Sequence, residues 1–352
     1  MFAEVHNPTD LDSEALDLYL ARGWFRMGQT IFTTNFLSFK HQLYSAVWLR
    51  ILLEEFHIDH TQQKLNKLNS KFRTEIQPAS MNAEKEILFE KYKESISFEA
   101  SASLNHLLYG EESYNIYNTY EINIYDSDVL IATGFFDLGK KSAAGISSFY
   151  DPDYKKHSLG KYLIYLKISY CKEQGLEYFY PGYFVPGYPL FDYKLEIGKS
   201  SLQYLSLTAQ QWHSIAAFSI SSTPFQIMCD RLKALQNLMR QKNVKSDFFS
   251  YEFYNANLIP ALKQYKLFDY PVFLYCFDSV KDTLNPIVVY DLVDQKYQLI
   301  QCISFFENSD FPVLQEGHYA LHLLKISQIL YSTSSSEEMA NLLMISEDKA
   351  LE

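Results

Sequence analysis

The stretch from Ile146 to Lys194 constrains the fold more than any other part of the chain. It begins within a run of strand-forming residues at 145–150. That run ends at Asp151-Pro152-Asp153, a combination that favours a turn because proline fixes its own backbone and restricts the residue before it. The pattern therefore predicts a strand that ends at a turn, after which a new element begins.

The next element is predicted to be a helix. Apolar residues recur at helical spacing from Leu159 to Ile168, and Ser158 is placed to cap the helix start. Gly175 suits the position just after the helix, where a left-handed backbone is common. Residues 177–180 then favour a strand. The stretch predicts a strand, helix and strand, followed by a loop crowded with tyrosines.

The residues before this unit predict a meander of strands preceded by helices. The expected helices are 13–21, 83–96 and 101–108, and the expected strands are 30–34, 44–51, 114–125, 129–138 and 143–150. The order from residue 83 to residue 184 is similar to that of Gcn5-related acyltransferases. In that fold an antiparallel meander leads into a helix whose N-terminus faces the acyl donor. The predicted class is α+β, with a Gcn5-related acyltransferase-like core.

The predicted domain organisation has three parts. An N-terminal subdomain with strands covers 1–80, the acyltransferase-like core covers 81–200, and a C-terminal α/β extension of unknown role covers 201–352. In the extension the pattern predicts strand 201–205, helices at 209–218, 224–242 and 317–330, three strands between 270 and 303, and a frayed polar tail from 332.

Composition narrows the class of protein. The 352 residues include no apolar run long enough to span a membrane, and the N-terminus lacks the form of a signal peptide. Four scattered cysteines without a CxxC pair favour buried free thiols over a metal site or disulfides. We therefore expect a cytoplasmic protein without a metal or cofactor. The net charge of −11 argues mildly against nucleic acid, although a local basic surface remains open.

Several motifs resemble those of arginyl-tRNA–protein transferases, the aminoacyl-tRNA–protein transferase family. The matching segments, in chain order, are Arg22-Gly23-Trp24-Phe25-Arg26-Met27-Gly28, Gly134-Phe135-Phe136-Asp137, Tyr150-Asp151-Pro152-Asp153-Tyr154, Ser158-Leu159-Gly160, Tyr180-Pro181-Gly182-Tyr183 and Tyr193-Lys194. The resemblance covers roughly the first 200 residues. It implies transfer of an aminoacyl group, arginine first, from aminoacyl-tRNA to the N-terminal amine of an acceptor protein that begins with Asp or Glu. Such a transfer marks the acceptor for degradation.

The sequence departs from the family pattern at two places. Tyr188, Leu190 and Phe191 stand where the family has Cys, Lys and Met. The family's N-terminal cysteine motif is absent, so no cluster is expected. These departures keep two alternatives open: a non-catalytic binder of protein N-termini or nucleotides, and a coenzyme A-dependent N-acyltransferase. The second would need a glycine-rich phosphate cradle, which the residues around Gly160 match poorly.

Aminoacyl transfer needs a deprotonated amine, an orienting pocket and donors for the oxyanion. We predict Asp151, Tyr183 and Tyr150 as catalytic residues. The predicted substrate-binding residues are Arg22, Trp24, Arg26, Asp153, Tyr154, Ser158, Gly160, Tyr180, Gly182, Tyr193 and Lys194. The helix start at Ser158 and Gly160 offers free N–H groups to an anion, and Lys194 offers a charge to phosphate.

Structural roles are open for many of the same residues. The Asp151-Pro152-Asp153 segment forms turns in any protein, Ser158 suits an N-cap, and the arginines can pair with acidic neighbours. Residues 231–245 carry five basic residues and no acid. They are either a tRNA-backbone surface or a solvated helix face.

Overall fold

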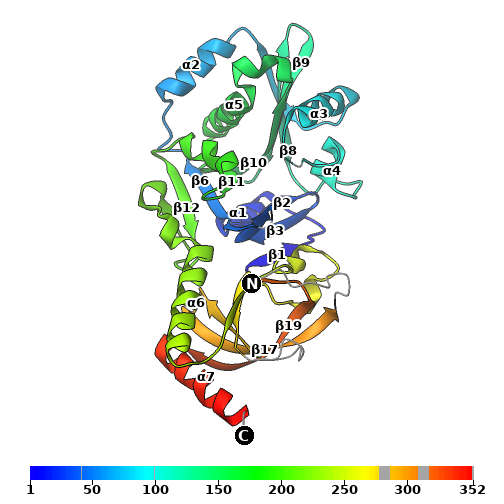
Figure 1. The fold of residues 1–352 in the computed structure, drawn as a ribbon. Helices are drawn as coiled ribbons and strands as arrows, with labels where there is room; N and C mark the ends of the chain where they lie inside the picture. Colours follow the sequence, from blue (N-terminus) through cyan, green and yellow to red (C-terminus); the bar gives the residue numbers. More distant parts are fainter. Residues whose placement is uncertain (41, 99, 277–285, 308–316, 351–352) are drawn as a thin grey trace.

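The computed structural model describes residues 1–350 except 41, 99, 277–285 and 308–316. Two large sheets lie at opposite ends of an elongated molecule, and a small N-terminal sheet lies between them (Figure 1). The α+β class predicted from the sequence is confirmed.

The larger sheet has eight strands in the order β13-β12-β6-β11-β10-β9-β8-β7. Their bounds are β6 Val47–Leu52, β7 Arg73–Pro78, β8 Thr119–Asp126, β9 Val129–Leu138, β10 Ser142–Tyr150, β11 Tyr178–Phe184, β12 Leu202–Ser206 and β13 Gln211–Ser214. Strands β8, β9 and β10 form the predicted antiparallel meander. Strand β11 returns parallel to β10 after a helix, so the predicted order is confirmed.

Helices cover both faces of this sheet, as alternation along its strands requires. On β9, Phe136 faces α2 (His60–Asn69) and α5 (Leu159–Glu173), while Phe135 faces α3 (Ala83–Ser95) and α4 (Leu104–Tyr109). Both phenylalanines are fully buried. These two neighbouring residues of β9 therefore pack against helices on opposite faces of the sheet.

Strands β10 and β11 separate partway along the sheet. They pair only over 142–144 and 178–180. The register of β10 against β9 then shifts between Gly145 and Ser147, which is a β-bulge. Strand β11 turns instead to β6, which it meets antiparallel. The bulge and the separation leave one edge of β10 without a strand partner beyond 144.

A buried lysine supports the bulge from beneath. Lys167 of α5 is 1% exposed and donates hydrogen bonds to the Ser147 carbonyl (2.6 Å) and to Ser148 Oγ (2.9 Å). Gly134 of β9 provides the space, since a Cβ there would lie 2.9 Å from Lys167 Cε. This glycine belongs to one of the segments that resemble the family, and its role is to admit a long side chain.

The N-terminal segment forms two small sheets and a helix. Strands β1 (Ala3–His6), β3 (Thr30–Thr34) and β2 (Phe25–Met27) make one sheet, and β4 (Phe36–Phe39) pairs with β5 (Gln42–Ser45). Helix α1 (Ser13–Ala21) begins where Asp12 accepts a hydrogen bond from the Ala15 N–H (2.7 Å). The predicted helix 13–21 and strand 30–34 have these bounds.

The C-terminal part is a six-stranded sheet with two helices. The strand order is β18-β14-β15-β16-β17-β19, and α6 and α7 pack together along it (Figure 1). The bounds are α6 Pro224–Gln241, β14 Asp247–Tyr251, β15 Val272–Tyr275, β16 Ile287–Asp291, β17 Lys296–Glu307, β18 His318–Tyr319, β19 His322–Thr333 and α7 Ser336–Ala350.

Three predictions for this part are wrong. Residues 317–330 are mostly strand β19, because ten residue pairs with β17 stabilise the strand, and a short apolar run alone does not distinguish a strand from a helix. The tail is helix α7, whose Met339 and Leu343 are buried at helical spacing. Residues 211–214 form the edge strand β13, which Trp212 fastens to the Ala21 carbonyl (2.9 Å).

The prediction for Ser158 is wrong in its mechanism. Its backbone is left-handed (φ 48°), and its side chain makes no capping hydrogen bond. A 3₁₀ helix, Pro152–His157, ends directly before it, so Ser158 serves as the joint between two helices rather than as a side-chain cap.

Candidate functional site

The Arg22–Gly28 segment is fixed to the large sheet by a buried ion pair. Arg26 donates to Asp137 Oδ1 (2.9 Å), and both side chains are almost completely shielded from solvent. Arg26 also donates to Thr119 Oγ1 (2.9 Å) and to the Gly28 carbonyl (2.8 Å). Its charge is therefore used inside the protein, where it holds two segments that resemble the family against each other.

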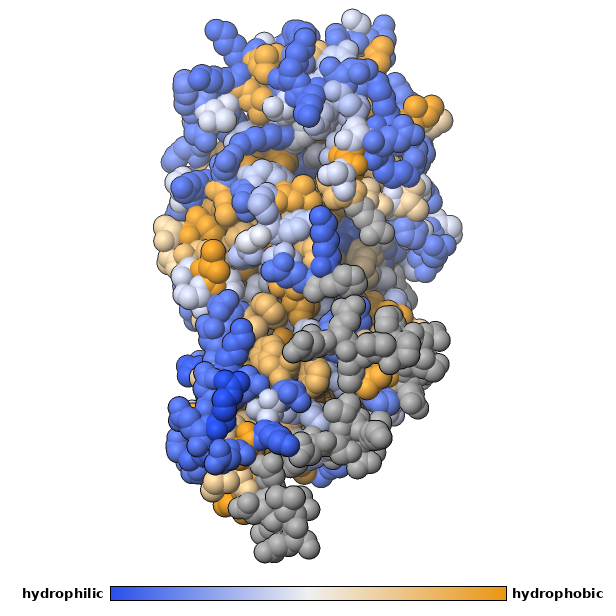
Figure 2. Space-filling model, viewed as in Figure 1, coloured by the Kyte–Doolittle hydropathy of each residue, from blue (hydrophilic) through white to orange (hydrophobic). Residues whose placement is uncertain are grey.

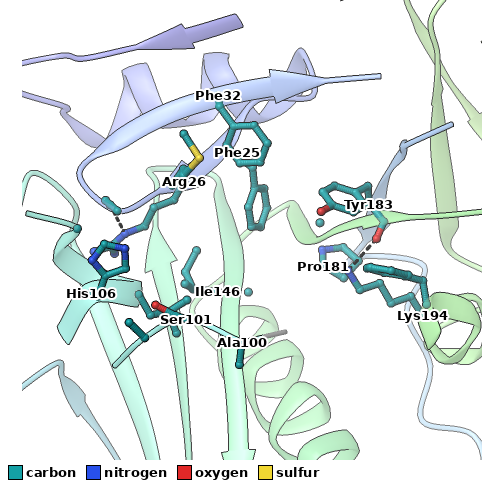
Figure 3. A pocket seen from close by; sticks show the side chains of 18 residues that line it. Phe25, Arg26, Phe32, Ala100, Ser101, His106, Ile146, Pro181, Tyr183 and Lys194 are labelled. Atoms are coloured by element: carbon teal, nitrogen blue, oxygen red, sulfur yellow. Dashed lines mark hydrogen bonds between the residues drawn. The ribbon is translucent and has the colours of Figure 1, made fainter. Parts of the chain in front are cut away.

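A cavity of about 630 Å³ opens where β10 and β11 separate, and we call it the first cavity (Figure 3). Its walls come from 25–28 and Phe32 of the N-terminal sheet, 100–102, α4, Gly145 and Ile146 at the bulge, 181–183 of β11, and Phe191 and Lys194 of the following 3₁₀ helix. Four predicted site residues line it: Arg26, Gly182, Tyr183 and Lys194.

Lys194 is the chemically distinctive residue of the first cavity. Its Nζ donates to the Tyr183 carbonyl (2.7 Å) and lies 5.4 Å from the Phe191 ring centre. No Asp or Glu is among the described residues that line the cavity. Burial without a carboxylate partner lowers the pKa of Lys194 to about 7. The ammonium keeps hydrogen-bonding capacity for a ligand.

Tyr183 provides the neutral donor of the cavity. Its hydroxyl points to the interior in Figure 3. Burial raises the pKa of this hydroxyl, so it stays protonated at neutral pH. The ring packs edge-on against Trp48 (5.1 Å between ring centres), which fixes its orientation. Gly182 has φ 85°, and a Cβ there would lie 3.3 Å from Lys194 Nζ. Glycine is thus required by the left-handed backbone, and a side chain here would also crowd Lys194.

Ser101 adds a second hydroxyl on the opposite wall. Its Oγ is buried and has no hydrogen-bond partner among the described residues. His106 lines the same cavity, but its Nδ1 lies 3.4 Å from Glu111 and it does not activate Ser101. The cavity therefore lacks an activated nucleophile of the serine–histidine type.

The predicted residues Asp151 and Asp153 lie elsewhere. Both pair with Lys91 of α3 at 2.7 Å, and neither is among the residues that line a described cavity. The pairing with Lys91 lowers the pKa of Asp153. Tyr154 donates to Asp126 Oδ2 (3.0 Å). The structure therefore gives these three residues partners in α3 and at the end of β8, and a catalytic role for Asp151 stays a prediction.

The remaining predicted residues of the core surround the start of α5. Tyr150 lies 5.5 Å from Tyr92, and a Cβ on Gly160 would lie 3.4 Å from the Tyr150 ring. Ser158 is exposed beside them. Two further tyrosines differ in exposure: Tyr193 is 44% exposed, and Tyr180 is buried against Trp212. Roles for these residues in substrate binding stay predictions.

Arg22 and Trp24 line a different hollow of about 670 Å³, which we call the second cavity. It lies between the N-terminal sheet, the β6–β12 side of the large sheet and the start of α6. The predicted segment Arg22–Gly28 thus contributes its first half to the second cavity and its second half to the first.

The departures from the family pattern have a structural explanation. Tyr188 stacks on Phe39 of β4 with ring centres 4.4 Å apart, and Phe191 packs on Tyr183 (5.6 Å). Leu190 is exposed. An aromatic cluster therefore holds the Tyr193-Lys194 segment where the family has Cys, Lys and Met.

Sequence reasoning did not identify Lys167, Trp48 or Ser101. The sequence does contain a pattern that indicates burial of Lys167. It follows Leu159 and Leu163 at intervals of four, which places it on the apolar side of α5. A lysine in that position is either buried with partners or reaches out to water. Trp48 and Ser101 give no signal of this kind, since only the tertiary structure brings them to the cavities.

The described residues contain no metal site and no membrane-spanning helix. No group of three or more His, Cys, Asp or Glu side chains is arranged to hold a metal ion in that part of the chain. The four cysteines are free and buried, as predicted. None of the helices within the described ranges is long and apolar enough to cross a membrane.

The first cavity fits direct transfer of an acyl group, since it offers donors and a cation but no activated nucleophile. The profile of the family described as "Arginine-tRNA-protein transferase, C terminus" matches residues 66–204. An aspartate/glutamate leucyltransferase of Leptospira interrogans is 32% identical over 193 residues, which cover 53% of this chain and 73% of the relative. The chain therefore belongs to the aminoacyl-tRNA–protein transferase family.

Other similarities are weaker. An aspartate/glutamate leucyltransferase of Campylobacter jejuni is 26% identical over 195 residues, covering 54% of this chain and 78% of the relative. The solved structure of FemX covers 55% of this chain and 68% of its own at 12% identity, with a TM-score of 0.34. A GCN5-related N-acetyltransferase from Kribbella flavida covers 41% and 49% at 11% identity, with a TM-score of 0.25. The fold class rests on the strand order of this chain rather than on these scores.

Proposed function

We propose that this protein transfers a leucyl group from leucyl-tRNA to the N-terminal amine of proteins that begin with Asp or Glu. The proposal replaces arginine, the amino acid first expected from the sequence. The names of the relatives support leucine and acidic acceptors. The protein's own cavity supplies an independent physical argument.

The observation that carries the proposal is the charge of the first cavity. A guanidinium side chain in an enclosed site needs a carboxylate, since a buried charge is costly unless it is paired. The cavity offers Lys194 and no Asp or Glu among its described residues. A leucyl side chain suits its rings and aliphatic groups, which include Phe25, Phe32 and Ile146.

The same cation suits the acceptor. An N-terminal Asp or Glu brings a carboxylate, and a lysine with no carboxylate partner can bind it by a charge-assisted hydrogen bond. Ala or Leu at the acceptor N-terminus would leave the ammonium unpaired. Lys194 therefore favours acidic acceptors in two ways. It binds their carboxylate, and it is left unpaired when the acceptor side chain is neutral.

The reaction forms one bond and breaks one. The acceptor's neutral amine attacks the ester carbonyl carbon, and the resulting tetrahedral oxyanion needs donors. The Tyr183 hydroxyl points into the cavity and stays protonated, so it is suited to donate to that oxygen. Collapse forms the amide and expels the ribose oxygen of the tRNA. The proton lost by the amine balances the proton gained by the ribose oxygen.

Proton removal makes few demands on the protein. An α-amino group has a pKa of about 7.7–8.0, so a useful fraction is neutral at physiological pH. The ester is already activated by synthesis of the aminoacyl-tRNA. Positioning and electrostatic stabilisation, rather than a covalent intermediate, therefore carry the catalysis.

The test uses the full chain with radiolabelled leucyl-tRNA and arginyl-tRNA and three acceptors that differ only in their first residue, Asp, Glu or Ala. We expect label from leucyl-tRNA on the Asp and Glu acceptors, and little on Ala. Transfer from arginyl-tRNA with none from leucyl-tRNA would contradict the choice of leucine. Absence of transfer from both would contradict the enzymatic proposal and favour a binding protein.

The variant Lys194→Met tests the acceptor argument. We expect kcat/KM for the Asp acceptor to fall about 10- to 100-fold, the range of a charged hydrogen bond of about 1.5–3 kcal/mol. The residual activity on Ala should change much less. Lys161→Met is the matched control, because Lys161 pairs with exposed Glu196 at 2.9 Å and lines neither cavity.

A further inference from the structure

The second cavity lies directly behind the first, with Trp48 as the partition. The Trp48 ring lines the second cavity, and it contacts three residues that line the first. These are Phe25, Phe32 and Tyr183, with ring centres 5.8, 6.0 and 5.1 Å away. Trp48 is 4% exposed, and its Nε1 donates to the Thr34 carbonyl (3.0 Å). The two cavities are therefore neighbours with a fixed wall.

Five of the residues that line the second cavity are aromatic: Phe2, Trp24, Trp48, Tyr204 and Phe218. Trp24 comes from the N-terminal segment, Tyr204 from β12, and Phe218 from the segment before α6. Tyr204 and Phe218 pack edge to face at 5.3 Å, which leaves ring surface for a ligand. Hydroxyl and amide side chains alternate with the rings, among them Thr33 and Asn35. Flat unsaturated ligands with polar edges suit such a surface.

Arg22 has the one cationic side chain among the described residues that line the second cavity, which Met1 also lines. The Arg22 side chain is exposed, and it forms no hydrogen bond or ion pair with the residues that the structure describes. Glu4 is the carboxylate among the described lining residues, and it is engaged by His6 at 3.0 Å. The cavity thus has a positive charge available at the same site as its aromatic rings.

A basic helix leads away from the second cavity. Helix α6 begins at Pro224, and Pro224 and Ile227 in its first turn line the second cavity. From residue 231 to residue 245 there are five basic residues and no acid, on a chain whose net charge is −11. Three of the five lie on α6, which also carries Asp230, and Lys242 beyond its end pairs with Glu337 at 3.0 Å. Arg231, Lys233 and Arg240 are exposed along α6. Eighteen helical residues extend about 27 Å. Figure 2 shows hydrophilic side chains at the lower left, where Figure 1 places α6.

We propose that the second cavity binds the single-stranded 3′ end of the donor tRNA, next to the aminoacyl-adenosine in the first cavity, and that α6 faces the acceptor stem. The inference rests on the proposed function. Unpaired bases stack on aromatic rings, and arginine pairs with phosphate. Because Trp48 is the shared wall, a ligand in the second cavity would lie next to a ligand in the first. The basic helix supplies the local charge that an acidic protein needs to hold a polyanion.

In this arrangement the two halves of the Arg22–Gly28 segment have different roles. Arg22 and Trp24 bind the strand that carries the ester, and Arg26 anchors the segment to the sheet through Asp137. Only three residues, Gly23, Trp24 and Phe25, lie between the two arginines. The segment thereby couples the position of the tRNA end to the wall of the first cavity.

The test measures affinity by filter binding at about 50 mM salt, where phosphate contacts are strong. Two RNAs are compared: uncharged leucine tRNA, and the same tRNA with its single-stranded 3′ end removed. We expect the intact RNA to bind about tenfold more tightly to the wild-type protein. Arg22→Glu should remove most of that difference, and Arg22→Lys should restore part of it. Equal binding of both RNAs by the wild-type protein would overturn the inference.

Arg73→Ala is the control, since Arg73 is an exposed arginine on β7, an edge strand of the eight-stranded sheet. It should bind both RNAs like the wild-type protein. Transfer assays separate this inference from the proposed function. With leucyl-tRNA as donor, Arg22→Glu should lower kcat/KM about tenfold, whereas transfer from the small donor leucyl-adenosine should be unchanged.

The outcomes lead to different conclusions. If the wild-type protein transfers no leucine, the proposed function fails whatever the binding shows. If it transfers leucine and Arg22→Glu affects both donors equally, Arg22 does not contact the tRNA end and the inference fails. If a free nucleotide binds the second cavity and leaves tRNA affinity unchanged, the cavity serves another ligand and the inference also fails.

Discussion

The buried pair Arg26–Asp137 allows a stability prediction that also tests whether Arg26 is available to substrate. The substitution Arg26→Met keeps a long side chain but removes the donors to Asp137, Thr119 and the Gly28 carbonyl. Asp137 would remain fully buried with only Thr119 as a donor (2.7 Å), and its Oδ2 already has no partner. An uncompensated buried charge of this kind costs about 3–5 kcal/mol.

Urea unfolding followed by circular dichroism measures the loss. A domain is stable by about 5–15 kcal/mol, so the variant should unfold at a much lower urea concentration. The double variant Arg26→Met/Asp137→Asn removes both charges. Its loss in the free energy of unfolding should be smaller than the sum of the losses of the two single variants by about 2 kcal/mol or more. The reason is that neither partner is then left as an unpaired buried charge.

The pH dependence gives a second check. Without Arg26, burial raises the pKa of Asp137 above its unfolded value, so the folded state favours the protonated carboxyl. The unfolded state then loses its proton first as the pH rises, and the variant loses further stability over that range. Lowering the pH from 7 to 5 should therefore shrink its deficit. A cost below 1 kcal/mol at pH 7, with no coupling to Asp137, would refute the reasoning and leave Arg26 free for substrate.

Three other outcomes follow from the site. Gly134→Ala should cost about 1–3 kcal/mol in urea unfolding, because its Cβ would lie 2.9 Å from Lys167 Cε. Burial lowers the pKa of Lys167 to about 7, below its unfolded value, so the wild-type protein should gain stability relative to Lys167→Met as the pH rises from 7 to 9. The gain is up to about 1.4 kcal/mol per pH unit, measured by urea unfolding at each pH. Because the pKa of Lys194 is lowered to about 7, KM for an Asp acceptor should rise in transfer assays above that pH, and KM for an Ala acceptor should not.

The sequence predicts the core well where periodicity and punctuation agree. Helix 13–21 and strands 30–34 and 129–138 have their predicted bounds, and Gly175 has the left-handed backbone expected after α5. These elements carry their own signals, such as a cap, a hairpin turn or strict alternation. Local signals suffice there because tertiary packing reinforces them.

The C-terminal part was predicted less well because its elements depend on partners far away in the sequence. Residues 322–333 are a strand through pairing with β17, and 336–350 are a helix through packing on α6. In the site, Arg26, Gly182, Tyr183 and Lys194 converge as the motifs suggest. The bulge of β10 and the Trp48 partition have no local signal, so the second cavity could not be predicted.

The position of Trp48 between the two cavities has a practical consequence. The chain has three tryptophans, and all of them lie around this one place. Trp24 and Trp48 line the second cavity, and Trp212 is bonded to the Ala21 carbonyl, one residue before Arg22. Tryptophan fluorescence, excited selectively over the 28 tyrosines, therefore reports on the partition and its surroundings. It can follow the filling of either cavity without a label. Unfolding confined to the C-terminal sheet would leave this fluorescence unchanged.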